Sequence, residues 1–514
     1  MWSRYDTRYR SCLLDHRLKQ KVKINPRQSV AENTMTQSDL SSILPFTILT
    51  IWACVLLLID LFIPKTRKSV TALLAALGLA ATLGFTLSQI GQEVSGFNGM
   101  VTLDGFSTFI NALILVSGLL GVALAYGYVK RMGIERGEYY ILLLFSVTGM
   151  MLMAQGADLI IVFLALELLS IPLYVLAAFA RPKEESEEAG LKYFLLGAFS
   201  SGFIVYGIAL IFGATQSTNL IAIVGSASHS TSNLLLTIGA ALLLIGFGFK
   251  VAAVPFHMWT PDVYQGAPTA VTAFMSSGAK IAGFATLLRV FATAFPSLAV
   301  DMTDILWALA ALTMIVGNVV AISQTDIKRL LAYSSIAHAG YILMAFVPYG
   351  NPDVRNVSIA AGLFYLVSYA FTNFGAWGVV IALEKSEGKG LQISDYAGLS
   401  KKHPALALAM TVFMLSLIGL PPTIGFIGKI YLFRAVIDGG FTGLAIIGVL
   451  TSLISAYYYL RVVVTMYMKD GEPVTERETW LDMTTMVTAL VTVVVSFVPQ
   501  FLFTWASEAV FKLF

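Results

Sequence analysis

Charged residues and cysteines are scarce in this sequence. Only 12% of the 514 residues are charged, 57% are hydrophobic, and the mean hydropathy is +0.78. Soluble domains carry about 25% charged residues, so this composition excludes an ordinary soluble fold. The two cysteines, Cys12 and Cys54, are too few for a disulfide framework or for an iron–sulfur cluster, which takes about four cysteine ligands.

Motifs for nucleotide and metal binding are also missing. The sequence has no GxGxxG fingerprint and no P-loop, and its five histidines show no His-x-x-His spacing. No Cys-x-x-Cys pair is present either. We therefore expect no redox centre, cofactor or metal on this chain, and no nucleic-acid partner.

Long apolar runs, by contrast, recur from one end of the chain to the other. Runs near 20 residues predict an all-α polytopic membrane protein, because a helix satisfies its own backbone hydrogen bonds in lipid. The alternating segments of about 10 residues that build a membrane β-barrel are absent. We expect about 14 transmembrane helices, beginning near Ile43, Ser69, Phe106, Tyr139, Asp158, Ala189, Asn233, Pro268, Thr303, Leu330, Val357, Pro404, Phe441 and Leu481.

Basic residues predict the orientation of these spans. Loops after odd-numbered spans contain 16 of them, whereas loops after even-numbered spans and the C-terminus hold only Arg355 and Lys512. By the positive-inside rule the odd loops face the cytoplasm, and both termini face the other side of a bacterial plasma membrane. Residues 1–34 are basic but lack the apolar core of a signal peptide. We expect this extension to be disordered or untranslated, with Met35 as the true start; a genuine basic tail is the alternative.

Four charged residues lie where lipid would surround them. They are Glu167, Lys250, Lys280 and Lys429, each within an apolar span. A charge at the centre of a membrane helix costs about 2.5–3.5 kcal/mol on insertion scales. Such groups persist when they face the interior of the bundle and find partners or water. We therefore predict that all four are functional.

Two of the predicted spans contain helix breakers. Pro255 interrupts span seven, and Pro421-Pro422 interrupts span twelve. Broken helices are tolerated in a membrane only within protein or along a water-filled path. The breaks are five spans apart, so spans 4–8 and 9–13 could form two inverted five-helix repeats. The expected division is residues 35–138 for spans 1–3, 139–300 and 301–470 for the two repeats, and 471–514 for a loop and span 14.

These charges predict a proton relay. Burial lowers the affinity of a lysine for its proton and a nearby carboxylate restores it, so a Glu167–Lys250 pair that opens and closes would act as a switch. The released proton would pass to Lys280, then through water and His338 to Lys429. His257, beside the first break, is a further candidate relay; a packed structural role is the alternative for either histidine. Glu188 and Lys192 are spaced to form an interfacial ion pair.

Three long motifs resemble a known family. "FKVAAVPFHMWTPDVYQGAPTAVTAFMSSGAKIAGF", "DIKRLLAYSSIAHAGY" and "GLPPTIGFIGK" are similar to the antiporter-like membrane subunits of respiratory complex I, NADH:quinone oxidoreductase. The resemblance runs from about Ser41 to the C-terminus and is nearest to the subunit N type. It implies two inverted five-helix repeats and proton-relay roles for Glu167, Lys250, Lys280 and Lys429. It adds Lys192 to these residues.

The resemblance also implies a setting for the chain. FMN, iron–sulfur clusters and quinone would reside on partner subunits, and their redox energy would drive proton transport here. The expected partners are a neighbouring M-type subunit, small membrane subunits and lipid. A subunit of a multisubunit Na⁺/H⁺ antiporter or of a hydrogenase-type membrane complex is the alternative. A non-transporting scaffold would leave the buried charges without a purpose.

Overall fold

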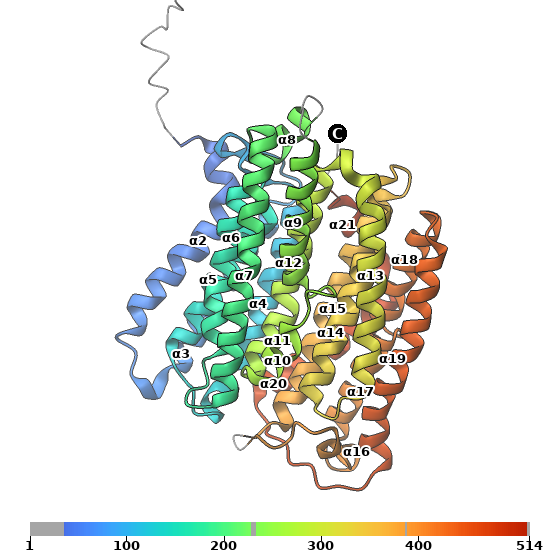
Figure 1. Ribbon diagram of the computed structural model, residues 1–514. Helices are drawn as coiled ribbons and strands as arrows, with labels where there is room; N and C mark the ends of the chain where they lie inside the picture. The colour runs from blue at the N-terminus through green and yellow to red at the C-terminus, as the bar shows by residue number, and fades with distance from the viewer. Residues whose placement is uncertain (1–34, 228–232, 386–387, 511–514) are drawn as a thin grey trace, which may run out of the picture.

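A computed structural model describes residues 35–227, 233–385 and 388–510, which form a bundle of helices (Figure 1). Within this part, 13 helices are long and apolar enough to cross a membrane. The predicted all-α polytopic membrane fold is confirmed. One antiparallel hairpin, β1 (Val94–Gly96) with β2 (Val101–Leu103), is also present. The predicted extension of residues 1–34 lies outside the described residues.

The described α-helices are α2 (Gln37–Asp60), α3 (Ser69–Ser88), α4 (Gly105–Arg131), α5 (Gly137–Gln155), α6 (Leu159–Ala177), α7 (Glu184–Thr215), α8 (Leu220–Ala227), α9 (Asn233–Val251), α10 (Trp259–Gly266), α11 (Thr269–Phe274), α12 (Lys280–Ala294), α13 (Ala299–Ile322), α14 (Ile327–Met344), α15 (Arg355–Leu383), α16 (Leu399–Lys402), α17 (Pro404–Ile418), α18 (Ile424–Asp438), α19 (Thr442–Met468), α20 (Thr479–Phe497) and α21 (Pro499–Glu508). A π-helical turn, Met275–Ala279, joins α11 to α12.

Both expected helix breaks are present. The seventh predicted span is divided between α9 and α10, with Pro255 in the link. The twelfth is divided between α17 and α18, each of 15 residues and therefore too short to be among the 13 long helices. Gly419, with φ of 89°, follows α17 in a left-handed conformation that glycine adopts without strain. The count of 14 spans and the inverted repeats stay predictions.

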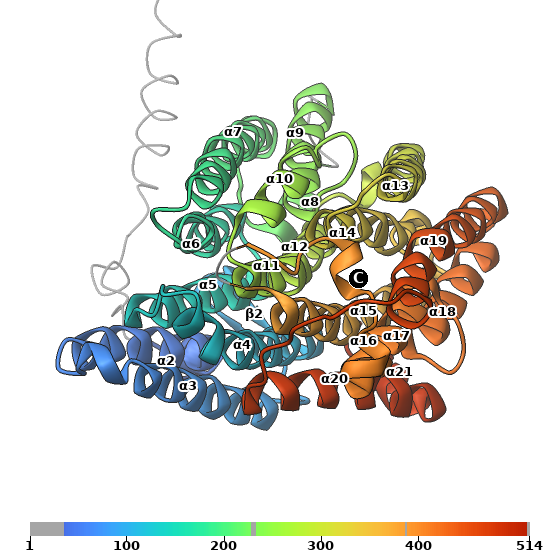
Figure 2. The same ribbon diagram turned by 90° about the horizontal axis from the view of Figure 1, so that it is seen from below.

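The most buried helices lie in the middle of the bundle. Seen along the bundle, α11, α12, α14 and α15 are surrounded by the other helices (Figure 2). Every residue in the most apolar 18-residue stretch of Thr269–Ala294 is buried, whereas fewer than half are in α2, α7 and α19. Large apolar side chains such as Phe199 and Leu453 are exposed on the outer helices. This outer surface suits lipid or neighbouring membrane subunits.

The two ends of the bundle differ. Residue 35 and the end of the described chain lie at the same end, and α16 lies at the opposite one (Figure 1). We call the end with α16 the basic end, because Lys130, Lys328, Lys401 and Lys402 lie in its loops and helix ends. The positive-inside rule predicts that this end faces the cytoplasm.

A charged contact holds three helix ends together at the basic end. Arg131, the last residue of α4, donates to Glu478 Oε1 at 2.6 Å and to the carbonyl of Ile381 in α15 at 2.7 Å. Glu478 directly precedes α20. Burial raises the pKa of the Glu478 carboxyl, and the Arg131 guanidinium opposes this shift. The arginine therefore offsets the cost of burying a carboxylate.

Replacing Arg131 by methionine should destabilise the bundle. The change removes two hydrogen bonds made by a charged donor and leaves Glu478 without its cation, so we expect a loss of about 2 kcal/mol. The measurement is the thermal unfolding midpoint in detergent, with Lys402→Met as a control. Lys402 forms an exposed pair with Glu472, and such pairs contribute little. Equal midpoints for the two variants would contradict the role of Arg131.

Candidate functional site

Lys280 lies at the centre of the bundle, as its position in the sequence predicted. It is the first residue of α12, directly after the π-helical turn, and its side chain is 1% exposed. Its ammonium donates to the carbonyl oxygen of Ser335 in α14. π-helical turns alter the direction of side chains locally and are frequent at functional sites. Here the turn precedes a lysine that has no ion pair within the described residues.

Lys429 lies at the second helix break. Its ammonium donates to the carbonyls of Leu417 and Ile418 at 3.0 and 2.8 Å, and to Ser452 Oγ at 2.8 Å. The two carbonyls belong to the last residues of α17, which have no further turn of helix to accept from. The break therefore creates acceptors at the negative end of a helix dipole, and Lys429 supplies the matching charge.

A chain of hydroxyl groups surrounds His338 between these two lysines. His338 Nδ1 lies 2.8 Å from Tyr365 Oη, and Nε2 lies 3.3 Å from Tyr459 Oη. Tyr459 Oη also hydrogen-bonds Ser334 Oγ, next in sequence to the residue that accepts from Lys280. His338, Ser334 and both tyrosines are buried. Every one of these groups can both donate and accept a proton.

Tyr341 continues this polar chain toward Lys429. Its hydroxyl accepts from Ser452 Oγ at 3.1 Å, and Ser452 in turn accepts from Lys429. The ammonium also lies 4.5 Å from the centre of the Tyr341 ring, a cation–π contact. The ring of His338 packs 5.6 Å from that of Tyr341. Hydrogen bonds thus extend from beside Lys280 to His338, and from Lys429 to Tyr341, whose ring packs against that histidine.

Lys250 and Glu167 lie close in the fold but are not joined. Lys250, the second-last residue of α9, is 4% exposed and donates to Ser170 Oγ at 2.7 Å. Glu167 is three residues earlier on the same helix as Ser170, and it accepts from Ser201 of α7. No ion pair links Glu167 to Lys250 in the described part of the chain. Lys250 therefore contacts a hydroxyl where the sequence analysis expects a carboxylate, and the switch stays a prediction.

The remaining two predicted residues lie nearer the surface. Lys192 is 41% exposed at the basic end and forms ion pairs with Glu188 at 2.7 Å and Asp262 at 2.8 Å. Arg329 binds the other oxygen of Asp262 at 2.9 Å. His257, in the link between α9 and α10, is buried, and its Nδ1 has no hydrogen-bond partner among the described residues. Neither residue contacts the chain of hydroxyls around His338.

The sequence analysis did not identify the hydroxyl groups. Those that hydrogen-bond a predicted residue are Ser170, Ser201, Tyr365, Ser452 and Tyr459, and Ser334 is linked to His338 through Tyr459. The sequence did indicate that Ser334 and Tyr341 lie near His338. They are four residues before it and three after it, a spacing that places all three on one helix face. Tyr365, Ser452 and Tyr459 are on other helices, and no local spacing connects them to the lysines.

Comparisons with known proteins all identify the same family. The family model described as NADH:quinone oxidoreductase/Mrp antiporter, TM, matches residues 156–455. The NADH-quinone oxidoreductase subunit N of Trichlorobacter lovleyi is 47% identical over 480 residues, covering 92% of this chain and 97% of the relative. That of Chloroflexus aggregans is 45% identical over 473 residues, covering 91% of this chain and 96% of the relative.

Solved structures agree with the sequence relatives. A chain of respiratory complex I from Thermus thermophilus with bound aureothin superposes with a TM-score of 0.78 and 36% identity, covering 90% of this chain and 99% of that one. A chain of the Mrp complex from a Dietzia species reaches a TM-score of 0.79, at 21% identity, over 91% of this chain and 97% of that one. At that identity the second match shows a shared fold alone.

Proposed function

The chain belongs to the NADH:quinone oxidoreductase/Mrp antiporter transmembrane family, and on that premise we propose that its buried lysines and His338 relay protons across the membrane. It is a multi-pass subunit of a proton-translocating NADH-quinone oxidoreductase in a bacterial membrane, of the subunit N type. Its partners are other membrane subunits of that complex. The proposal concerns which residues of this chain move the proton.

The polar chain between Lys280 and Lys429 carries the proposal. A proton that leaves the Lys280 ammonium is transferred to the Ser334 hydroxyl and then, through the Tyr459 hydroxyl, to His338. From His338 it continues to the hydroxyls of Tyr341 and Ser452. Lys429 receives it and releases it at the break between α17 and α18. Each lysine alternates between amine and ammonium: an N–H bond breaks when the proton leaves and forms again when the next proton arrives. Water would bridge the gaps on either side of His338, since buried polar groups recruit it.

Lys250 would control the supply of protons in the first half of the chain. Its ammonium donates a hydrogen bond to Ser170 Oγ, and Ser170 lies one helical turn after Glu167. We propose that a rotation of the lysine side chain exchanges Ser170 for Glu167. The closed pair would hold the proton on Lys250, and the open arrangement would favour its release toward Lys280. Lys192 and Asp262 would connect this half to the basic end.

The energy for this cycle must come from partner subunits. We place FMN, iron–sulfur clusters and quinone on other chains of the complex, and the basic end of this chain on the cytoplasmic side. A membrane potential of 100 mV opposes each charge moved by about 2.3 kcal/mol, so an external drive is needed to open the Glu167–Lys250 pair. A redox-driven change at the interface with a neighbouring subunit would supply it.

Purification from native membranes with a C-terminal tag tests the assignment. We expect flavin, iron–sulfur absorbance and NADH:quinone activity to accompany the chain after mild detergent extraction. Recovery of polytopic partners without any chromophore would contradict it and favour an ion-driven antiporter. A tagged unrelated membrane protein from the same cells is the control for carry-over.

Removal of the Tyr459 hydroxyl should slow the relay. Tyr459→Phe keeps the ring in place but disconnects Ser334 from His338, so we expect proton pumping to fall about tenfold, within the range of positioned proton-transfer groups. Tyr457→Phe is the matched control, because that side chain is 62% exposed on the outer face of the same helix. The measurement is NADH-driven acidification of vesicles that contain the complex. Equal rates for the two variants would remove Tyr459 from the relay.

A further inference from the structure

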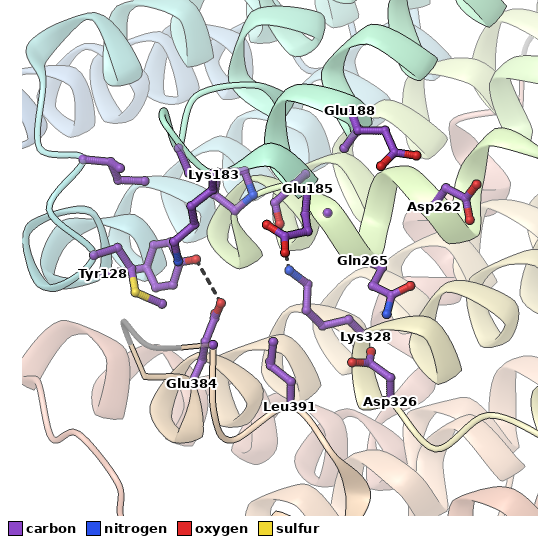
Figure 3. Close-up of a pocket in the computed structure, with 18 of the residues that line it drawn as sticks. Tyr128, Lys183, Glu185, Glu188, Asp262, Gln265, Asp326, Lys328, Glu384 and Leu391 are labelled. Carbon is purple, nitrogen blue, oxygen red and sulfur yellow. Dashed lines mark hydrogen bonds between the residues drawn. The ribbon is translucent and has the colours of Figure 1, made fainter.

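Two further buried charges lie at the basic end, in a pocket that the relay residues Lys192 and Asp262 also line. This pocket, of about 580 Å³, opens between the first and second halves of the chain. Its walls include the end of α4, the start of α7, the α10–α11 link, the start of α14 and the loop after α15 (Figure 3). Glu384 and Lys328 lie in this pocket and are both buried. Neither has a role in the relay described above.

Glu384 has an incompletely satisfied carboxyl group. It directly follows α15 and is 5% exposed. Tyr128 Oη donates to its Oε1 at 3.4 Å, the contact drawn in Figure 3, and Oε2 has no hydrogen-bond partner in the described chain. A buried carboxylate needs a cation, water or a proton to offset the loss of solvent. The adjoining pocket can supply water to this oxygen.

Lys328 brings a positive charge into the same pocket without pairing with Glu384. Its ammonium is 2% exposed and donates to the carbonyl of Ala267 at 2.7 Å. An ammonium has three protons to donate, and no ion pair with Glu384 is formed within the described residues. The other titratable groups that line this pocket are Tyr128 from α4, Lys183 before α7, Glu185, Glu188 and Lys192 in α7, Asp262 in α10 and Asp326 before α14.

A line of unsatisfied hydroxyls leads from this pocket toward Lys280. Tyr128 Oη accepts from the backbone N–H of Thr269, the first residue of α11. Lys280 follows eleven residues later, about 16 Å along the same run of helix. The buried hydroxyls of Thr269, Tyr264 and Ser335 have no hydrogen-bond partner in the described structure. Ser335 is the residue whose carbonyl accepts from Lys280. Buried hydroxyls without partners mark positions for ordered water.

We propose that protons enter the subunit through this pocket, which Lys192 and Asp262 share, and that Glu384 is the group that loads them onto a direct path to Lys280. The inference rests on the proposed relay function. The Glu384 carboxylate takes up a proton that hydronium in the medium delivers through the water of the pocket, and becomes a carboxylic acid. It then gives that proton to the water chain along Thr269, Tyr264 and Ser335, which protonates the Lys280 amine and restores the carboxylate. The Lys328 ammonium, in the same pocket, repels a second proton.

Glu384→Gln tests the entrance in the complete complex reconstituted in vesicles, with the basic end facing the medium. The initial rate of NADH-driven proton uptake is measured between pH 6 and pH 9. We expect Glu384→Gln to slow uptake at least tenfold, with a larger defect at higher pH, because protons must then reach Lys280 without a collecting group. Glu384→Asp should retain most of the rate. Glu472→Gln, an exposed carboxyl of the same end, is the control.

Two further variants keep the test decisive. Tyr128→Phe removes the hydroxyl between Glu384 and Thr269 without changing the shape of the side chain, and should slow uptake at least threefold even if Glu384→Gln does not assemble. If both variants take up protons at the wild-type rate across the pH range while Lys280→Ala does not pump, the proposed role of Glu384 is wrong and the relay still stands. Wild-type pumping by Lys280→Ala would overturn the relay itself.

Discussion

Lys280→Ala should reduce NADH-driven proton pumping by more than tenfold while the complex still assembles. Lys280 is the central amine of the proposed relay, and among the described residues no other basic side chain donates to the Ser335 carbonyl. Assembly should survive, because the ammonium is buried at a cost and makes one hydrogen bond to a backbone carbonyl. Pumping is measured as acidification of reconstituted vesicles, and assembly as co-purification of partner subunits.

Lys280→Arg separates proton transfer from electrostatics at this position. A guanidinium keeps the positive charge but does not release its proton at any ordinary pH. If Lys280 carries the proton, the arginine variant should pump as poorly as the alanine variant. Pumping at the wild-type level by Lys280→Arg would show that only the charge matters, and the relay would then have to bypass this residue.

Lys429→Met should both stop pumping and loosen the second helix break. The ammonium satisfies the carbonyls of Leu417 and Ile418 and also binds Ser452. Methionine fills a similar volume but offers no donor, so two buried carbonyls lose a charged partner, each at a cost of about 1.5–3 kcal/mol. We expect pumping to fall by more than tenfold and amide hydrogens at the end of α17 to exchange faster.

Lys429→Arg and Lys469→Met are the controls for this residue. Arginine can still donate to the carbonyls of α17 but cannot release a proton, so it should restore slow amide exchange without restoring pumping. Lys469 is exposed after α19, and its replacement should change neither measurement. If the arginine variant pumps normally, Lys429 stabilises the break and is not a member of the relay.

The predictions for Lys280 and Lys429 depend on residues that the sequence alone identifies as functional candidates. A lysine within an apolar run is costly, so its presence in "SSGAKIAGF" or "GFIGKIYLF" is evidence of a buried use, whatever the surrounding fold. The two broken helices were visible in the same way, since proline removes a backbone donor and clashes with the preceding turn. Family resemblance then supplied the identity of the complex, which the charges alone left open.

The contacts of those residues were not visible. Composition and apolar periodicity could not show that Lys250 donates to Ser170 instead of pairing with Glu167. The partner of Lys250 depends on how α9 packs against α6. They also gave no sign that Lys328 is buried. Its position beside Arg329 at the end of a span is typical of a solvent-exposed basic loop, yet it is 2% exposed beneath the α10–α11 link.

By itself, the sequence determined the all-helical membrane fold, the two breaks and the four charges within apolar spans, because each is a local consequence of placing polar or helix-breaking groups in lipid. Only the tertiary structure decided which groups connect those charges. Ser334 and His338 on α14, Tyr365 on α15 and Tyr459 on α19 come together across distant segments. Serine and tyrosine occur throughout membrane helices at little cost, so they become part of a proton path only where helix packing aligns their hydroxyl groups.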